Sequence, residues 1–160
     1  MTNGATITAS SANTGPNPGN ASDISINAGQ SLEMRDSSIT TQAKQASGGN
    51  INIQAVDRIR LVNSVVSSSV ADGPGGGGNI SIDPQVVALQ DSKILSQAAD
   101  GQGGAIKIIT SLFLRDANSI VNADAGSSGL NGTVTVQSPP SNLSQTLGTL
   151  PSQSIKAHRP

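Results

Sequence analysis

The sequence predicts an all-β protein, a parallel β-helix of about four to five coils with three short strands in each coil. An alternating apolar triplet of the Ile-x-Ile type recurs five times, at separations of 27, 29, 26 and 28 residues. A repeat of this length cannot bury its apolar side alone and must stack on its neighbours. Each unit also holds two further stretches in which apolar and polar residues alternate, which is the pattern of a strand with one buried face. The triplets begin at Ile24, Ile51, Ile80, Ile106 and Val134.

Composition restricts what can fill such a solenoid. The 160 residues are 34% apolar and include one aromatic residue, Phe113, so aliphatic side chains must form the interior. Charged residues are 12% of the chain and the net charge is −1. So weak a charge provides no electrostatic footprint for nucleic acid or for an anionic membrane.

Several other classes are excluded by what the sequence lacks. It has no cysteine, which excludes disulfides and thiolate metal sites. No apolar run approaches the ~18–20 residues of a membrane-spanning helix, so no membrane span is predicted. The opening Met1 to Gly4 has neither the basic start nor the apolar core of a signal peptide, so we expect an export signal either to lie outside this sequence or not to exist.

Residues 1–20 are predicted to form a partial first coil and a loop. Ala5 to Thr8 alternate weakly and are expected to form a truncated strand. Residues 11–20 are rich in Gly, Pro, Asn and Ser, which is typical of a loop.

Residues 21–137 are predicted to form the β-helix itself, and the unit from Gly49 to Gly76 illustrates one coil. Its first strand places Ile51 and Ile53 inward, and its second places Ile59 and Leu61 inward. A third inward row of smaller side chains follows: Val66, Ser68 and Val70. Three strands and three turns in each repeat indicate a β-helix coil.

Coils stacked about 4.8 Å apart place equivalent side chains above one another, so each inward row becomes a ladder. We predict three ladders. The first comprises Ile24, Ile51, Ile80, Ile106 and Val134; the second Met34, Leu61, Leu89 and Leu114; the third Ile39, Val66, Ile94 and Ile120. The last coil has one additional residue between Leu114 and Ile120, so Val121 and Ala123 are an alternative inner pair there.

Glycines gather just before the first strand of the later coils. They are Gly48 and Gly49, Gly75 to Gly78, Gly103 and Gly104, Gly129 and Gly132. A sharp corner with positive φ is the predicted reason, because glycine adopts that conformation without strain.

Residues 138–160 are predicted to be a capping segment and a disordered tail. The repeat stops at Pro139 and Pro140, and Leu143, Leu147 and Leu150 then recur at helix-like spacing. A short helix or turn folded over the open end would protect an unpaired strand edge.

Few residues are candidates for chemistry, and no catalytic residue or cofactor is predicted. The single histidine, His158, lies in the tail. Gly75 to Gly78 lack the Lys-Ser/Thr of a phosphate-binding loop. A carbohydrate-active β-helix, either a lyase or a hydrolase, remains the alternative. The nearest approach to its carboxylate and basic groups is Asp57, Arg58 and Arg60.

Aspartates recur near two corners of the predicted coil. One set is Asp72, Asp100 and Asp124; the other is Asp36, Asp91 and Asp116, with Asn63 between them. Stacked carboxylates could bind Ca²⁺, but Asp and Asn also form Asx turns with their own backbone. We therefore interpret these positions as turns and leave a Ca²⁺ site open as the alternative.

The sequence motifs of residues 21–151 resemble those of a known protein family. It contains the coil opening Gly-Gly-Asn-Ile-x-Ile at 48–53, and it closes with Gly-Thr-Val-x-Val-x-Ser-Pro at 132–139, Asn-Leu-Ser at 142–144 and Leu-Pro at 150–151. These motifs are similar to the C-terminal end of filamentous-haemagglutinin-like exoproteins. That family consists of large adhesins of Gram-negative bacteria and cyanobacteria that are exported by two-partner secretion.

The resemblance implies a right-handed helix, an extracellular or cell-surface location, and adhesion rather than catalysis. The implied partners are a glycan or receptor on a host or neighbouring cell and, for the full-length protein, an outer-membrane transporter. The family's signal peptide and N-terminal secretion domain are not recognisable here, so we expect a segment of a larger exoprotein. From the open edge of the uncapped N-terminal coil we also predict end-to-end self-association.

Overall fold

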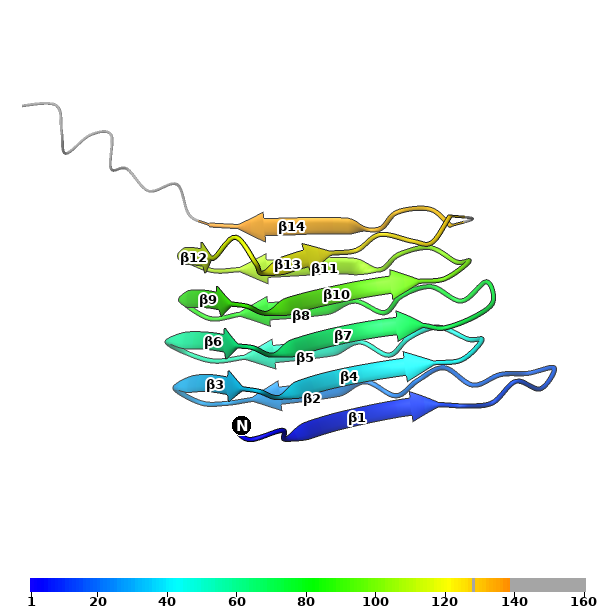
Figure 1. The fold of residues 1–160 in the computed structure, drawn as a ribbon, viewed down its shortest axis with the longest axis horizontal. Coiled ribbons are helices and arrows are strands. Elements are labelled where there is room, and N and C mark those ends of the chain that lie inside the picture. Colours follow the sequence, from blue (N-terminus) through cyan, green and yellow to red (C-terminus); the bar gives the residue numbers. More distant parts are fainter. Residues whose placement is uncertain (128, 139–160) are drawn as a thin grey trace, which may run out of the picture.

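A computed structural model describes residues 1–127 and 129–138 of the chain and shows a parallel β-helix (Figure 1). Strands from successive coils pair in parallel and build three sheets, which confirms the predicted three strands in each coil. Sheet A contains β1 (Thr6–Ser11), β4 (Ser38–Ala43), β7 (Val65–Val70), β10 (Lys93–Ala98) and β13 (Ile120–Asn122). Sheet B contains β2 (Ile24–Asn27), β5 (Ile51–Gln54), β8 (Ile80–Asp83), β11 (Ala105–Ile109) and β14 (Thr133–Gln137). Sheet C contains β3 (Ser31–Arg35), β6 (Arg58–Val62), β9 (Val86–Gln90) and β12 (Leu112–Arg115).

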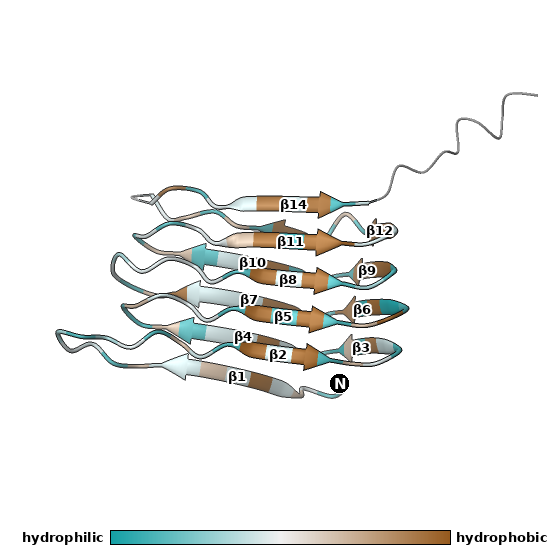
Figure 2. Cartoon of the chain, turned by 180° about the vertical axis from the view of Figure 1, so that it is seen from behind, coloured by the Kyte–Doolittle hydropathy of each residue, from teal (hydrophilic) through white to brown (hydrophobic). Residues whose placement is uncertain are grey.

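The first predicted ladder is present in sheet B. Its five residues pair in register from coil to coil: Ile24, Ile51, Ile80, Ile106 and Val134. The middle members are fully enclosed. Figure 2 shows apolar residues, in brown, on all five strands of this sheet. Val134 keeps the register but is 44% exposed, because β14 is the last described strand of this sheet.

The second ladder is correct for Met34, Leu61 and Leu89, which stack in register in sheet C. The prediction is wrong for Leu114, which pairs with Ala88 and is 49% exposed. Phe113 lies above Val87 and packs against the core instead. Residues 112–114 are all apolar, so alternation alone could not show which of them faces inward.

In the last coil, the third ladder uses the alternative inner pair, Val121 and Ala123, that was predicted from the additional residue before Ile120. The prediction holds for three members, Ile39, Val66 and Ile94. It is wrong for Ile120, which is 42% exposed and pairs with Lys93. Val121 pairs with Ile94, and Ala123 is buried beyond it. The longer turn before β13 therefore shifts the strand by one residue, which exchanges its two faces.

The glycine clusters have a different role from the predicted one. Among the described glycines, positive φ occurs at Gly4, Gly29 and Gly73, none of which belongs to the clusters that precede the strands. A Cβ on Gly49 would lie 2.1 Å from the Ser22 carbonyl oxygen, and one on Gly78 would lie 2.1 Å from the Gly49 oxygen. The coils approach too closely here for any side chain, so glycine is required for space.

The two ends also bear on the predictions. A strand is present near the predicted Ala5 to Thr8, but it is not truncated: β1 has six residues, as many as β4, with which it pairs. It takes in Ser11, the first residue of the predicted loop, and residues 12–23 between β1 and β2 contain no strand. Beyond Ser138, the predicted cap and tail lie outside the described residues. Within residues 1–127 and 129–138 there is no helix of the length and apolarity that crossing a membrane requires.

Candidate functional site

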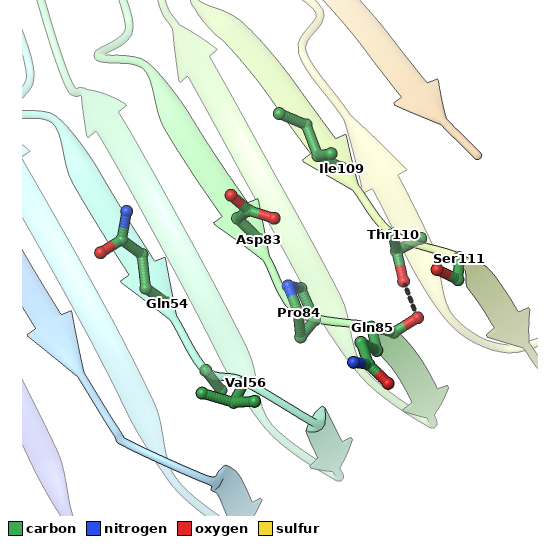
Figure 3. Close-up of a pocket in the computed structure, with 9 residues that line it drawn as sticks. Gln54, Val56, Asp83, Pro84, Gln85, Ile109, Thr110 and Ser111 are labelled. Carbon is green, nitrogen blue, oxygen red and sulfur yellow. Dashed lines mark hydrogen bonds between the residues drawn. The ribbon is translucent and has the colours of Figure 1, made fainter. Parts of the chain in front are cut away.

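A groove runs along the corner where sheet B turns into sheet C. We call it the corner groove; its cavity volume is about 350 Å³ (Figure 3). Three successive coils contribute to it through Gln54 and Val56, Asp83 and Pro84, and Ile109 and Thr110. The groove therefore crosses the coils along the axis of the rod.

The local sequence explains why the corner is open. Three residues join β5 to β6, but only two join β8 to β9 and β11 to β12, so successive corners do not superimpose. Pro84 stands in the second corner and has no N–H to donate to the coil below it. The third corner is fixed by Thr110, whose Oγ1 donates to the Gln85 carbonyl oxygen at 2.8 Å (Figure 3).

The lining combines apolar and polar groups. Ala55 is buried at the base and Val56 is 56% exposed beside it. Gln54, Asp83 and Gln85 are exposed, and their side chains make no hydrogen bond or ion pair to another described residue. Amide and carboxylate groups can donate to and accept from ligand hydroxyls. The groove thus offers free hydrogen-bonding groups beside a small apolar surface.

The residues that line the corner groove do not include the pair of carboxyl groups that glycoside hydrolysis ordinarily uses. Asp83 is the single carboxylate there, whereas hydrolysis of a glycosidic bond ordinarily uses two carboxyl groups. No group of three His, Cys, Asp or Glu residues placed to hold a metal ion occurs in the described part of the chain.

The Asp and Asn residues at the turn after sheet C behave as turn residues. Asp36, Asn63 and Asp91 have φ values of 49°, 46° and 47°, a conformation in which Asn and Asp are several-fold enriched. Their side chains also stack: Asn63 Nδ2 donates to Asp36 Oδ1 at 2.6 Å, and Asn118 Nδ2 donates to Asp91 Oδ1 at 2.8 Å. Asn118 is therefore the fourth member of this row of side chains, and Asp116, which was predicted to share this corner, lies in the same turn two residues earlier.

Asp116 has a separate role in the same turn. Its carboxylate accepts from the backbone N–H groups of Asp91 and Ser119, both at 2.9 Å. Hydrogen bonding from the Ser119 side chain, followed by that from the Asp91 backbone, lowers the pKa of the Asp116 carboxyl below its ordinary value. These contacts use the carboxylate to close the turn.

The other predicted aspartate set lies on the surface just beyond the strands of sheet A, where Asp72 and Asp100 each follow the paired residues Val70 and Ala98 by two positions. Asp72, Asp100 and Asp124 are all exposed. Asp124 Oδ2 accepts from Asn122 Nδ2 at 2.8 Å, within its own coil.

The charged residues on sheet C pair with one another across an exposed face. Glu33 Oε1 lies 2.6 Å from an Arg35 guanidinium nitrogen and 3.4 Å from one of Arg60. Hydrogen bonding and charge from Arg35 lower the pKa of the Glu33 carboxyl. Asp57 instead accepts from Gln30 at 3.1 Å. Asp57 and Arg60 therefore have different partners, and His158 lies outside the described residues.

A buried serine ladder was missed by the sequence analysis. It consists of Ser37, Ser64, Ser92 and Ser119, all within 6% exposure. Each of the first three donates its backbone N–H to the hydroxyl of the next, at 3.0–3.2 Å. The signal was available, since each serine directly follows an Asp or Asn at the same 27- or 28-residue spacing. These hydroxyls are structural and are not available to a ligand.

Comparisons of the chain with protein-family models, with curated proteins and with solved structures found no match.

Proposed function

We propose that this chain is a non-catalytic, adhesive segment of a secreted or cell-surface protein of the filamentous-haemagglutinin-like type. The observation that carries the proposal is the outer face of sheet B. Its polar side chains stand in register one above another, in the row Ser25, Asn52, Ser81, Lys107 and Thr135. A second row contains Asn27, Gln54 and Asp83 and runs into the corner groove.

Such rows repeat hydrogen-bonding groups about every 4.8 Å along the rod. A hydroxyl-rich polymer can contact several of them at once, and several weak contacts on a rigid support give useful avidity. The chain carries a net charge of −1 and so has no excess of positive charge, which favours a neutral glycan over an anionic polymer. We therefore propose a glycan, or a glycosylated receptor, as the partner.

The interior supports a scaffold role. Aliphatic ladders fill it, and its buried hydroxyls are engaged by backbone groups, as in Ser68 Oγ, which donates to the Gly49 carbonyl oxygen at 2.7 Å. No buried side-chain nitrogen or oxygen in the described residues lacks a hydrogen-bond partner. Export through an outer-membrane transporter, and the cell-surface location, rest on the resemblance of residues 21–151 alone.

Incubation of the purified chain with a panel of neutral and acidic polysaccharides, with and without Ca²⁺, tests the proposal. We expect binding without cleavage, measured by glycan microarray and by chromatography of the polysaccharide afterwards. Cleavage would establish the lyase or hydrolase alternative instead. Absence of both binding and cleavage across the panel would reject the adhesive role.

The contact surface is tested separately with a double variant, Gln54→Ala with Asp83→Asn. We expect it to weaken glycan binding at least about fivefold, which corresponds to the loss of one or two net hydrogen bonds. Gln42→Ala, an exposed glutamine on the outer face of sheet A, is the matched control and should leave the affinity unchanged.

A further inference from the structure

A second groove runs along the edge where sheet A ends and the chain turns toward sheet B. Two cavities form it, with volumes of about 360 and 320 Å³, and Ala71 lines both of them. They lie beside the C-terminal ends of β4, β7 and β10 (Figure 1). We call this surface the side groove. It is separate from the corner groove, because the two have no lining residue in common.

Two neighbouring rows of outward side chains form the side groove, one of them polar and the other mostly small. The polar row is Ser10, Gln42, Ser69 and Gln97, which pair from coil to coil. The second row is Ala12, Lys44, Ala71 and Ala99, each of which directly follows a strand of sheet A. An alanine side chain ends at Cβ, so the second row forms an apolar floor below the longer side chains of the polar row.

The side groove is long. Its lining runs from Ser10 on β1 to Gly126, which follows β13, and therefore crosses all five coils of sheet A. Five coils at about 4.8 Å each make a groove of about 19 Å along the rod. A groove of this shape fits a linear molecule better than a compact one.

The polar side chains at the N-terminal end of the side groove are unengaged. Ser10, Gln42 and Lys44 are exposed, and their side chains make no hydrogen bond or ion pair to another described residue. At the other end, Asp124 already accepts from Asn122 Nδ2 at 2.8 Å. The groups that are ready for a ligand are therefore one hydroxyl, one amide and one ammonium group.

Lys44 gives the side groove its charge at this end. It is the one cation among the described residues that line the groove. Asp72 lies on the next coil and donates its backbone N–H to the Lys44 carbonyl oxygen at 2.8 Å, but no ion pair joins the two side chains in the described part of the chain. The corner groove has the opposite sign, with Asp83 as the one charged group of its described lining. The two grooves therefore favour ligands of different charge.

We propose that the side groove is a second glycan site, specific for a linear glycan that carries a carboxylate sugar such as a uronic acid. This inference rests on the proposed adhesive function. Lys44 pairs with the carboxylate, Gln42 and Ser10 bond to hydroxyl groups, and the apolar face of a sugar ring lies on Ala71. One carboxylate on an otherwise neutral glycan suits a protein with a net charge of −1.

An extended acidic peptide is the competing occupant. Peptides of this kind ordinarily bind by adding a strand to an exposed sheet edge. The side groove lies on the outer face of sheet A, where β4, β7 and β10 are each paired on both sides and offer no free edge. Recognition there depends on side chains alone, which favours a hydroxyl-rich ligand.

Nuclear magnetic resonance titration of the full chain separates the two grooves. The probes are cellotetraose, which is linear and neutral, and the same tetrasaccharide with its terminal glucose oxidised to glucuronic acid. We expect the acidic probe to shift the amide signals of Gln42, Lys44 and Ala71, and the neutral probe to shift those of Gln54 and Asp83.

The location of the shifts distinguishes the possible failures. If the acidic probe shifted the corner groove alone, the side-groove site would be wrong and the adhesive role would stand. If it shifted neither groove, the side-groove site would again be wrong, and the adhesive role would depend on the polysaccharide panel. A capped serine peptide with one glutamate is the competing probe, and tighter binding of this peptide at the side groove would overturn the glycan assignment.

Lys44→Gln tests the charge that carries the inference. We expect it to weaken binding of the acidic probe about threefold to fivefold, the upper range for an exposed ion pair. This difference should disappear at about 1 M salt, where the screening length is about 3 Å. Lys93→Gln removes the same charge from the outer face of sheet A outside the groove and is the matched control. Equal weakening by the two variants would overturn the role of Lys44.

Ala71→Leu tests the floor of the side groove. Ala71 is exposed, so the larger side chain fills the groove and leaves the core intact. We expect binding of the acidic probe to fall at least about tenfold, and binding of the neutral probe at the corner groove to stay unchanged. Ala88→Leu, on the outer face of sheet C, is the matched control and should change neither. Undiminished binding of the acidic probe by Ala71→Leu would overturn the site.

Discussion

The backbone N–H of Ser37 donates to the hydroxyl of Ser64 at 3.2 Å, across the boundary between two coils and 27 residues along the chain. Ser64 Oγ in turn donates to the Val62 carbonyl oxygen at 2.7 Å. One hydroxyl thus satisfies a buried donor on the coil before it and an acceptor on its own coil. Because the same pair of bonds recurs at Ser92, the turn after sheet C is held by a chain of side-chain bonds where the strand ladder is interrupted.

Ser64→Ala should destabilise the rod by about 1–3 kcal/mol, because it leaves the buried Ser37 N–H without a partner. Urea unfolding followed by circular dichroism measures the change. Ser69→Ala is the matched control; Ser69 is partly exposed on β7 and should cost less than about 0.5 kcal/mol. Equal losses in the two variants would show that the hydroxyl bond contributes nothing.

The fold was predictable because the repeat constrains it over the whole chain. A triplet that recurs at 26 to 29 residues can be buried only by stacking, whatever happens within one unit. Whether a given side chain points inward or outward was predictable only where apolar and polar residues alternate strictly, as at Ile51 and Ile53. At Leu112 to Leu114, and at Ile120 with Val121, consecutive apolar residues leave the choice to the length of the preceding turn.

The corner groove could not be predicted for a related reason. Its lining comes from three coils, and it exists because successive turns have three, two and two residues and one of them contains Pro84. A repeat pattern indicates that turns superimpose; it does not indicate where they fail to do so. The glycine clusters illustrate the same limit, since composition does not distinguish positive φ from close approach.

The corrected register of β12 predicts different outcomes for two neighbouring residues. Phe113→Ser should destabilise by about 1.5–3 kcal/mol, because it removes a partly buried aromatic side chain that packs on the core. Leu114→Ser should cost less than about 1 kcal/mol, because Leu114 is half-exposed on the outer face. Chemical unfolding of the two variants side by side measures the difference in stability. A larger loss of stability for Leu114→Ser would instead support the sequence-based prediction that Leu114 faces inward.

Gly78→Ala tests the close approach of the coils. The added Cβ would lie 2.1 Å from the Gly49 oxygen and 2.5 Å from Ser68 Oγ, and the first of these is backbone that cannot move without displacing a strand. We expect a loss of more than about 2 kcal/mol and a lower melting temperature. Gly19→Ala, where the nearest atom would be 3.8 Å away, is the control and should melt with the wild type.

Acid should weaken the turn that Asp116 closes. The ordinary pKa of this carboxyl is 3.8, and its hydrogen bonds lower it in the folded protein. A lowered folded pKa stabilises the fold above the unfolded value, and this contribution is lost as the pH falls through the folded pKa. We therefore expect Asp116→Asn, which keeps the acceptor oxygen, to show a smaller drop in melting temperature than the wild type between about pH 5 and pH 2. Glu33→Gln should reduce the drop in the same direction, because the pKa of Glu33 is also lowered. An equal drop in melting temperature for the wild type and Asp116→Asn over this pH range would contradict the role assigned to the carboxylate.

Ile80→Asp tests the ladder on which the architecture depends. Ile80 is fully buried between Ile51 and Ile106, which pair with it from the coils on either side. An aspartate there would be an uncompensated charge among aliphatic side chains, at a cost of more than about 5 kcal/mol, which is comparable to the total stability of a small domain. We expect loss of the β signal in circular dichroism and rapid proteolysis at 25 °C. Ser81→Asp adds the same charge one residue away on the outer face, beside Lys107, and should remain folded. If both variants kept the wild-type melting temperature, the side chain at position 80 could not be part of an enclosed apolar row.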